Sequence, residues 1–402
     1  MKEAFIIDGI RTPIGKFRGT LSDVRADDLA ALVIQNLMDR NPSIPKEAID
    51  DVILGCHNQA GDDNRNVARM AALLAGLPVS VPGETINRLC ASGMSAVVQA
   101  NRAIKTGDGD LFISGGLEHM TRSPMVMSKP SLPYGNDAKL YDSSFGWRFV
   151  NPKMESLYGT ESMGETAENL VDSQHINRKD QDLFAYNSQM KAAKAQQSGR
   201  LAREIVPVTI PLRKGNPLLI SEDEFIRPDT SLDALAGLRP AFRTEGGTVT
   251  AGNSSGLNDG AAALLIASEV AVSNYKLKPL ARILSSQVVG VEPGIMGIGP
   301  VEASNKALKK AGLTFNDLDI IELNEAFAAQ SLACIRSWGL EDDDPRINPN
   351  GGAIALGHPL GMSGARIILT AALQLQDTGG RYALCTMCVG VGQGYAVVIE
   401  RV

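Results

Sequence analysis

The chain has 402 residues, enough for two domains of ordinary size and an insertion. Its 45 acidic and 39 basic residues give a formal charge of −6, whereas a nucleic-acid-binding protein carries excess positive charge. Nucleic acid is therefore not an expected partner. No run of about 18 apolar residues occurs, so no membrane span is expected.

The N-terminal segment reads as a strand, because residues 4–7 are apolar and charge follows at once. That run is too short for a signal peptide. The five cysteines are an odd number with no disulfide-type spacing. This usage favours a reducing cytosol, and we expect a cytoplasmic protein.

Short runs rich in β-branched residues then alternate with helical patterns. They lie at 52–54, 111–114, 262–267, 283–289, 320–323 and 382–388. This alternation is typical of an α/β fold and predicts mostly parallel sheets covered by helices. Residues 119–246 interrupt it with a segment rich in Pro, Ser, Met and aromatic residues. A polar helical stretch follows at 162–200, which opens like a capped helix at Met163.

Cys90 precedes a run of small residues that predicts a deeply buried helix. A cysteine at a helix N-terminus feels the positive end of the helix dipole, which favours the thiolate. Taken alone, however, a free cysteine is more often inert and buried. The two interpretations stay open for Cys90 by itself.

Asn324 ends the strand predicted at 320–323, and His358 lies between Gly357 and Pro359 in a glycine-dense segment. Asn324 fits either a helix N-cap or an amide that orients a water or an oxyanion. A histidine like His358 is commonly structural. Paired with Cys90, it becomes a candidate base or oxyanion donor.

Cys388 forms a C-x-x-C pair with Cys385 and runs into Gly390, Gly392 and Gly394. The pair follows an apolar strand rather than opening a helix, so a redox dithiol is disfavoured. No second C-x-x-C exists to complete a four-ligand zinc site, and we expect no metal. The glycines let backbone N–H groups approach a ligand closely, as an oxyanion hole requires.

The two halves of the chain repeat each other. At an offset that pairs Cys90 with His358, residues 93–95 fall on 361–363 and residues 51–54 fall on 319–322. Two further matches occur in the same order, 109–115 with 380–386 and 4–9 with 281–286. An internal duplication predicts two similar packed α/β units. We assign 1–118 plus 247–271 to the first unit, 272–402 to the second, and 119–246 to an inserted loop domain.

Four segments together resemble the active-site blocks of the thiolase family, and the resemblance covers nearly the whole chain. They are Asn-Arg-Leu-Cys90-Ala-Ser-Gly-Met, Asn324-Glu-Ala-Phe-Ala, Gly-His358-Pro and Cys388-x-Gly-x-Gly-x-Gly. The resemblance implies two pseudo-equivalent units layered α-β-α-β-α. It also implies that Cys90 is the acylated nucleophile and Cys388 the acid/base at the α-carbon of acetyl-CoA.

By the same resemblance, His358 activates Cys90 and, with a water held by Asn324, binds the enolate oxygen. The N–H groups of Cys90 and Gly390 would form a second oxyanion hole. Coenzyme A is a co-substrate, and no cofactor is implied. A homotetramer is implied, with residues of about 120–147 supplying much of the contact between its dimers.

Four residues match coenzyme A or pocket positions of the family: Ser255, Met163, Arg227 and Phe327. Many biosynthetic acetoacetyl-CoA thiolases carry His-Met where this chain has Ser162-Met163. Segments 55–69, 146–152 and 385–393 instead look like the 3-oxoadipyl-CoA thiolases, whose substrate has a terminal carboxylate. Such a substrate needs a cation, and Arg148 is a candidate, although a surface or tetramer-contact arginine fits it equally well.

Other activities remain as alternatives. The chain could be an acetoacetyl-CoA thiolase or a broad fatty-acid 3-ketoacyl-CoA thiolase. A decarboxylating ketoacyl synthase shares the duplicated architecture, but such enzymes use one cysteine and usually two histidines. A non-catalytic CoA-binding relative would be expected to lack a reactive residue, whereas all four are present here.

Overall fold

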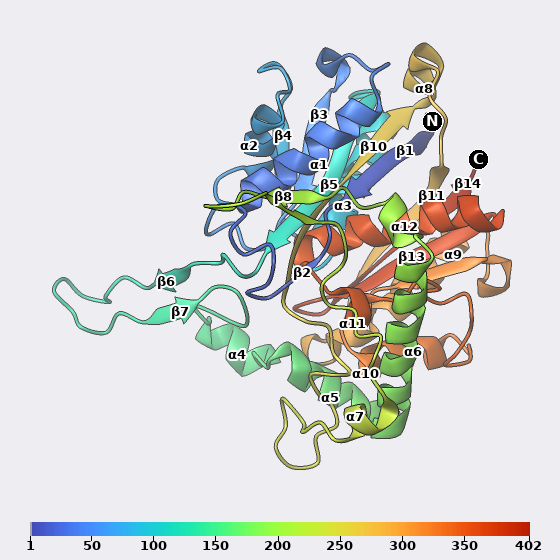
Figure 1. Ribbon diagram of the computed structural model, residues 1–402. Helices are drawn as coiled ribbons and strands as arrows, with labels where there is room; N and C mark the ends of the chain where they lie inside the picture. Colours follow the sequence, from blue (N-terminus) through green and yellow to red (C-terminus); the bar gives the residue numbers. More distant parts are fainter. Residues whose placement is uncertain (1) are drawn as a thin grey trace.

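The computed structural model describes residues 2–402, and its centre is a ten-stranded sheet (Figure 1). Nine strands run in the order β12-β13-β14-β11-β1-β10-β5-β3-β4, and the short β2 pairs with β10. The strands are β1 Ala4–Arg11, β2 Gly15–Lys16, β3 Asp51–Gly55, β4 Gly83–Ile86, β5 Leu111–His119, β10 Asn258–Ser268, β11 Ala281–Gly290, β12 Ile320–Leu323, β13 Tyr382–Val389 and β14 Gln393–Arg401.

Helices from both halves of the chain cover this sheet. They are α1 Ala26–Arg40, α2 Val67–Leu74, α3 Ser92–Thr106, α8 Glu269–Tyr275, α9 Gly299–Ala311, α10 Ala328–Ser337, α11 Ala353–Leu356 and α12 Leu360–Thr378. Within residues 2–402, no helix combines the length and apolarity needed to cross a bilayer.

The sheet shows the internal duplication directly. β3 runs parallel to β5, β5 antiparallel to β10, and β10 antiparallel to β1. The second half repeats this pattern with β12, β13, β14 and β11. The halves join through β1 and β11, which pair only at Phe5–Arg282 and Ile6–Ala281. The prediction of two pseudo-equivalent α/β units is therefore confirmed.

The prediction of mostly parallel sheets is wrong. Only β3–β4, β3–β5 and β12–β13 are parallel pairs of the main sheet. β10 is buried at every residue, so its sequence lacks the alternation that usually marks an antiparallel strand. The sequence reading also missed β14, which begins inside the glycine-rich segment and returns antiparallel to β13.

The helices form layers on either side of the sheet halves. α3 and α12 pack against each other in the middle, and α12 contacts strands of both halves (Figure 1). α1 and α2 cover the outer face of the first half, and α9 covers that of the second. Successive residues of β10 show this: Leu264 and Ile266 face the central helices, while Ala263 and Leu265 face α1.

Between β5 and β10 the chain leaves these layers. This segment contains β6 Met125–Met127, β7 Leu140–Asp142, α4 Pro152–Tyr158, α5 Met163–Gln174, α6 Arg178–Gln197, β8 Val208–Ile210, β9 Leu218–Ile220 and α7 Leu232–Ala236. α5 opens with the predicted cap, in which Ser162 and Glu165 form a capping box. The stretch expected at 162–200 is two helices, because His175 turns the backbone at φ 54°. The proposed domain boundaries stay a prediction.

β6 and β7 form an arm that projects from the body of the molecule (Figure 1). Its apolar side chains lie in solvent, with Met127 68% and Leu140 63% exposed. Leu132 and Tyr134 at the tip are exposed as well. An apolar surface of this kind on a single chain marks a contact site.

Candidate active site

The N-terminal ends of α3 and α12 cross in close contact at glycines. A Cβ on Gly93 would lie 2.4 Å from the carbonyl oxygen of Gly361, and one on Gly364 would lie 2.5 Å from the nitrogen of Met94. Only glycine permits so close an approach. The crossing brings together the two chain segments that carry Cys90 and His358, the positions paired by the repeat.

Cys90 lies two residues before α3, one residue ahead of the N-cap Ala91. Burial raises the pKa of its thiol to about 11, although the backbone N–H groups of Gly390 and of Cys90 itself oppose this. The favourable effect expected from the helix end is therefore outweighed by burial in the resting protein. Cys90 starts as a thiol and needs a base.

His358 can supply that base from its Nε2 atom. Its Nδ1 lies 2.7 Å from Ser363 Oγ, which donates its own proton to the carbonyl oxygen of Pro359. Nδ1 must therefore carry the ring proton, which leaves Nε2 as an acceptor. Burial, helped by the charge of Arg366, lowers the pKa of His358 to about 3, so the ring is neutral at physiological pH.

Asn324 does not cap a helix. α10 begins at Ala328, and its N-cap is Phe327. The Asn324 side chain instead lies with its Nδ2 3.4 Å from His358 Nε2. Its Oδ1 is buried and has no hydrogen-bond partner within the described residues. Of the two interpretations, the structure favours the polar role beside the histidine.

Cys388 is buried near the end of β13, in one apolar cluster with Phe327 and Met163. Burial raises the pKa of its thiol well above the usual value, and the nearby Cys90 and Cys334 raise it further. Cys385 packs in a different cluster on the opposite face of β13. The two cysteines of the C-x-x-C segment therefore cannot act as one dithiol.

The loops that present Cys90 and Gly390 hold strained backbone conformations. Leu89 has φ 47°, Val391 φ 62° and Gly392 φ 80°. A β-branched residue such as Val391 rarely adopts a left-handed conformation, so the surrounding structure must impose it. The turn places Gly390 next to Cys90, and its N–H acts to lower the pKa of the thiol.

The two thiols and the Gly390 N–H thus adjoin one another, the neutral imidazole lies beside the Asn324 amide, and the crossing of α3 and α12 brings the two segments together. Comparison with protein-family models identifies the family. A profile described as "Thiolase, N-terminal domain" matches residues 4–270, and one described as "Thiolase, C-terminal domain" matches residues 277–401. The chain belongs to the thiolase family. It is accordingly an acyltransferase.

Named relatives of this thiolase match it over its full length. It is 60% identical over 402 residues to the "3-oxoadipyl-CoA/3-oxo-5,6-dehydrosuberyl-CoA thiolase" of Escherichia coli, with 100% of both chains covered. It is 58% identical to a "Beta-ketoadipyl-CoA thiolase" of Acinetobacter baylyi, again with 100% of both covered. The crystal structure of the Bacillus anthracis acetyl-CoA acetyltransferase superposes with a TM-score of 0.92 at 40% identity, covering 100% of this chain and 99% of that one.

Glu118 at the end of β5 connects the catalytic segments of this thiolase, and sequence reasoning missed it. Its buried carboxylate accepts the N–H groups of His57, Asn58 and Gly361 at 2.9–3.1 Å. Burial raises its pKa to about 7. Because Gly361 follows His358 closely, one carboxylate ties the 57–58 loop to the histidine segment. No sequence pattern around Glu118 signals this role.

Glu325, next to Asn324, is a second buried carboxylate that sequence reasoning missed. It accepts hydrogen bonds from Ser188 Oγ at 2.6 Å, Asn348 Nδ2 at 2.7 Å and the N–H of Ile354 at 3.2 Å. A Cβ on Gly352 would lie 2.1 Å from its Cδ. Glu325 therefore fixes the Asn324 loop against the segment that leads to His358.

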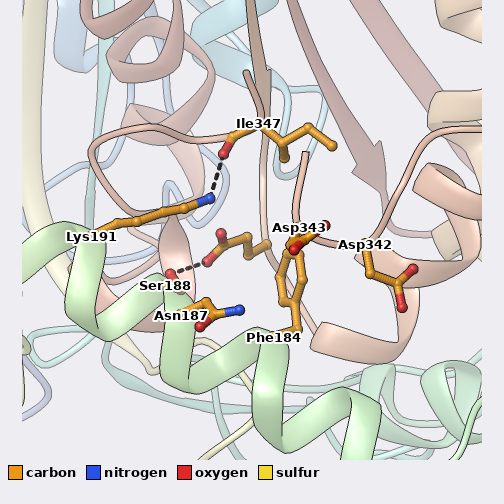
Figure 2. Close-up of a pocket in the computed structure, with 8 residues that line it drawn as sticks. Phe184, Asn187, Ser188, Lys191, Asp342, Asp343 and Ile347 are labelled. Atoms are coloured by element: carbon orange, nitrogen blue, oxygen red, sulfur yellow. Dashed lines mark hydrogen bonds between the residues drawn. The ribbon is translucent and has the colours of Figure 1, made fainter. Parts of the chain in front are cut away.

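A hollow on the far side of Glu325 opens between α6 and the loop before Asn348. Figure 2 shows Lys191 reaching the carbonyl of Ile347 across it. Its lining residues are Phe184, Asn187, Ser188, Lys191, Glu325, Asp342, Asp343 and Ile347. None of the four candidate catalytic side chains is among them, so this hollow is not the reaction site.

The residues matched to coenzyme A positions fall into two groups. Met163 and Phe327 contact the cluster around Cys388. Ser255 lies in the loop before β10 and donates from its hydroxyl to the carbonyl of Ala326. Arg227 is exposed, with its guanidinium over the ring of Phe225. That ring packs on Gly256, beside Ser255, so the loops of Arg227 and Ser255 adjoin.

Arg148 lies half-buried beside the 57–58 loop. It donates to the carbonyl of Ser143 at 3.3 Å and to Asn58 Oδ1 at 3.4 Å. It therefore contacts the body of the protein rather than projecting along the β6–β7 arm. Its role in substrate binding stays a prediction.

Cys56, Asp63 and Glu118 come close enough together to resemble a metal site, with ligand atoms within 4.8 Å of one another. Hydrogen bonds already account for the cluster. The Cys56 thiol donates to Asp63 at 3.6 Å, and Glu118 is held by the three N–H groups described above. We regard the cluster as structural.

Proposed function

We propose that this thiolase cleaves 3-oxoadipyl-CoA with coenzyme A, giving acetyl-CoA and succinyl-CoA. The observation that carries the chemistry is the meeting of Cys90, Cys388 and the His358–Asn324 pair at the crossing of α3 and α12. The names of the E. coli and A. baylyi relatives support the substrate, since both describe acyl groups with a second carboxyl group.

In the first half-reaction, the Cys90 sulfur attacks the 3-keto carbon while His358 Nε2 takes the thiol proton. The bond between the α- and β-carbons then breaks, and its electron pair becomes the acetyl-CoA enolate. His358 and a water held by Asn324 bind the enolate oxygen, and the Cys388 thiol donates a proton to the carbon. A raised pKa suits Cys388 to this step, because it keeps the thiol protonated.

In the second half-reaction, the Cys388 thiolate takes the proton of a new coenzyme A thiol, whose sulfur attacks the acyl group on Cys90. The proton that His358 took in the first half-reaction returns to the Cys90 sulfur when the intermediate collapses. The tetrahedral oxyanion lies against the N–H groups of Cys90 and Gly390, which already converge on the sulfur. One such donor lowers the barrier by about 3–4 kcal/mol. Collapse releases the shortened acyl-CoA and returns Cys90 to the thiol. Every step is reversible, so the enzyme can run in either direction.

Coenzyme A itself is the co-substrate, and we expect no further cofactor. Met163 and Phe327 would line the pantetheine path to Cys388, with Ser255 beside it. The exposed Arg227 would lie at the nucleotide end. We expect the protein to work in a reducing cytosol, in keeping with the free state of all five cysteines in the described chain.

A substrate panel in the thiolytic direction tests the proposal. We expect kcat/KM for 3-oxoadipyl-CoA to exceed the values for acetoacetyl-CoA and 3-oxohexanoyl-CoA. A preference for acetoacetyl-CoA would instead indicate an acetoacetyl-CoA thiolase, the activity named for the B. anthracis structure. A preference for 3-oxohexanoyl-CoA would indicate a fatty-acid 3-ketoacyl-CoA thiolase.

Replacing Arg148 with alanine should lower kcat/KM for 3-oxoadipyl-CoA roughly 10- to 100-fold. A charged hydrogen bond to the terminal carboxylate contributes about 1.5–3 kcal/mol. Acetoacetyl-CoA lacks that carboxylate, so its kcat/KM should change little in steady-state assays of the same variant. Equal losses on both substrates would show that Arg148 is structural.

We further propose a homotetramer in which the β6–β7 arm supplies much of the contact between dimers. Light scattering should report a tetramer for the native chain. The double variant Met127→Asp, Leu140→Asp should yield a dimer, because it places two charges on the exposed apolar arm. Leu219→Asp, on the exposed β8–β9 hairpin, is the control and should stay tetrameric. A native monomer or dimer would contradict the tetramer, and a double variant that stays tetrameric would contradict the role of the arm.

A further inference from the structure

We propose that His57 and Arg148 together bind the terminal carboxylate of the acyl chain, with Asn58 holding Arg148 in place. This inference rests on the proposed function, because only a substrate with a second carboxyl group can use such a site. Its new element is His57, which lies outside the four active-site blocks and has been given no role so far.

The guanidinium of Arg148 keeps its charge available. Within residues 2–402 it makes no ion pair, and its two hydrogen bonds go to neutral oxygens of Ser143 and Asn58. Asn58 is itself fixed, since its N–H donates to Glu118 and its amide donates to Ser143 Oγ. An arginine held in this way retains free N–H donors for a planar anion.

His57 is the neighbour of Asn58, the residue that contacts Arg148. Its side chain is 23% exposed, and its Nδ1 lies 4.0 Å from a Glu118 oxygen. Burial and the charge of Arg148, in that order, lower the pKa of His57 to about 4, while Asp63 acts in the opposite direction. Arg148 contacts Asn58, the residue next to His57, and its charge acts on the imidazole. The terminal carboxylate of the substrate would bind to both side chains.

The 57–58 loop adjoins the reacting atoms. Glu118 Oε2 accepts the N–H of both His57 and Gly361, which joins this loop to the histidine segment. Asn87, three residues before Cys90, donates from its side chain to the carbonyl of His57. The loop is therefore bonded to both catalytic segments. A succinyl group on Cys90 has only two methylenes before its carboxylate, so the carboxylate stays near the sulfur.

Occupation of the site should couple substrate choice to pH. The groups that face His57 are Arg148 from the insertion, Glu118 from β5 and Asp63 from its own loop. A carboxylate paired with Arg148 offsets the charge that lowers the pKa of His57, so this pKa rises on binding. Protonated His57 binds the anion more strongly. Preference for the carboxylate substrate should therefore increase as the pH falls towards the raised pKa.

The test compares two substrates that differ only at the chain end, 3-oxoadipyl-CoA and 3-oxohexanoyl-CoA. The ratio of their kcat/KM values, measured from about pH 6 to 8.5 on the purified full chain, cancels the catalytic steps that both share. In the native enzyme this ratio should rise as the pH falls. In His57→Phe it should be roughly 10-fold lower and independent of pH.

Asn58→Asp provides a second variant, because it places a competing carboxylate on Arg148. It should also lower the ratio of the two kcat/KM values. His175→Asn is the control, since His175 is exposed and its left-handed backbone accepts asparagine. Its ratio should match the native enzyme at every pH.

A native ratio in His57→Phe, or equal losses on both substrates, would overturn the inference. A native ratio that does not vary with pH would overturn it as well. A native enzyme with no preference for 3-oxoadipyl-CoA would contradict the proposed function itself. The two failures are distinguishable, because the first appears in the variants and in the pH profile, and the second in the native enzyme at a single pH.

Discussion

Cys90→Ala should abolish acyl transfer in both directions while the fold survives. Removing the nucleophile of a covalent mechanism lowers kcat by about 10⁴- to 10⁶-fold. The small side chain at the half-buried position before α3 leaves packing of the core helices intact, so the free energy of unfolding should change little. Steady-state thiolysis and thermal unfolding of the same preparation measure the two effects.

Mass spectrometry after incubation with acetyl-CoA identifies the acylated residue. The native chain should carry an acetyl group on the peptide that contains Cys90, and Cys90→Ala should carry none. Cys385→Ala is the matched control, because Cys385 is also free but faces the opposite side of β13 from Cys388. An adduct on Cys388 with Cys90 unmodified would reverse the assigned roles.

The sequence predicted the fold through its internal repeat. The positions that pair Cys90 with His358 fall at the N-terminal ends of α3 and α12, which cross at Gly93 and Gly361. Small residues at equivalent positions in both halves made this crossing visible, because a close helix contact demands them in sequence. Strand direction could not be predicted in this way. A strand buried on both faces has the same continuous apolar sequence whether it runs parallel or antiparallel to its neighbours.

The polar framework of the site was beyond sequence reasoning. Glu118 and Glu325 act through hydrogen bonds to backbone N–H groups, which any residue type can supply. Their partners lie far away along the chain, 243 residues in the case of Gly361. The balance of effects on the pKa of Cys90 was beyond sequence reasoning for a related reason. The helix end could be inferred locally, whereas the burial that outweighs it depends on the whole fold.

For substrate choice, too, one residue could be nominated from local chemistry and the other only from the fold. Arg148 could be nominated from chemistry alone, because a terminal carboxylate requires a cation. His57 could not, since its relevance comes from lying beside Arg148 across 91 residues of chain. Asn58 connects the two segments, because its side chain contacts Arg148 although the two residues are 90 positions apart in the chain.

Cys388→Ala should still acylate at Cys90 but lose exchange of the α-hydrogens of acetyl-CoA. The buried thiol lies near the end of β13, two residues before Gly390, and general acid–base groups contribute about 10²- to 10⁴-fold. Deuterium incorporation into acetyl-CoA, followed by NMR in heavy water, should fall by that factor. The acetyl adduct on Cys90 should form as in the native chain.

This combination separates the two thiols, because a merely structural role for Cys388 would impair both readouts together. Its side chain packs with Phe327 and Met163, so a collapsed pocket would also block acylation. Cys334→Ala tests the remaining possibility, since Cys334 is the other thiol whose charge reaches Cys388 and burial raises its own pKa to about 12. Loss of exchange in Cys334→Ala, with native exchange in Cys388→Ala, would transfer the acid–base role to Cys334. Native exchange in both variants would assign the acid–base role to a group other than a cysteine.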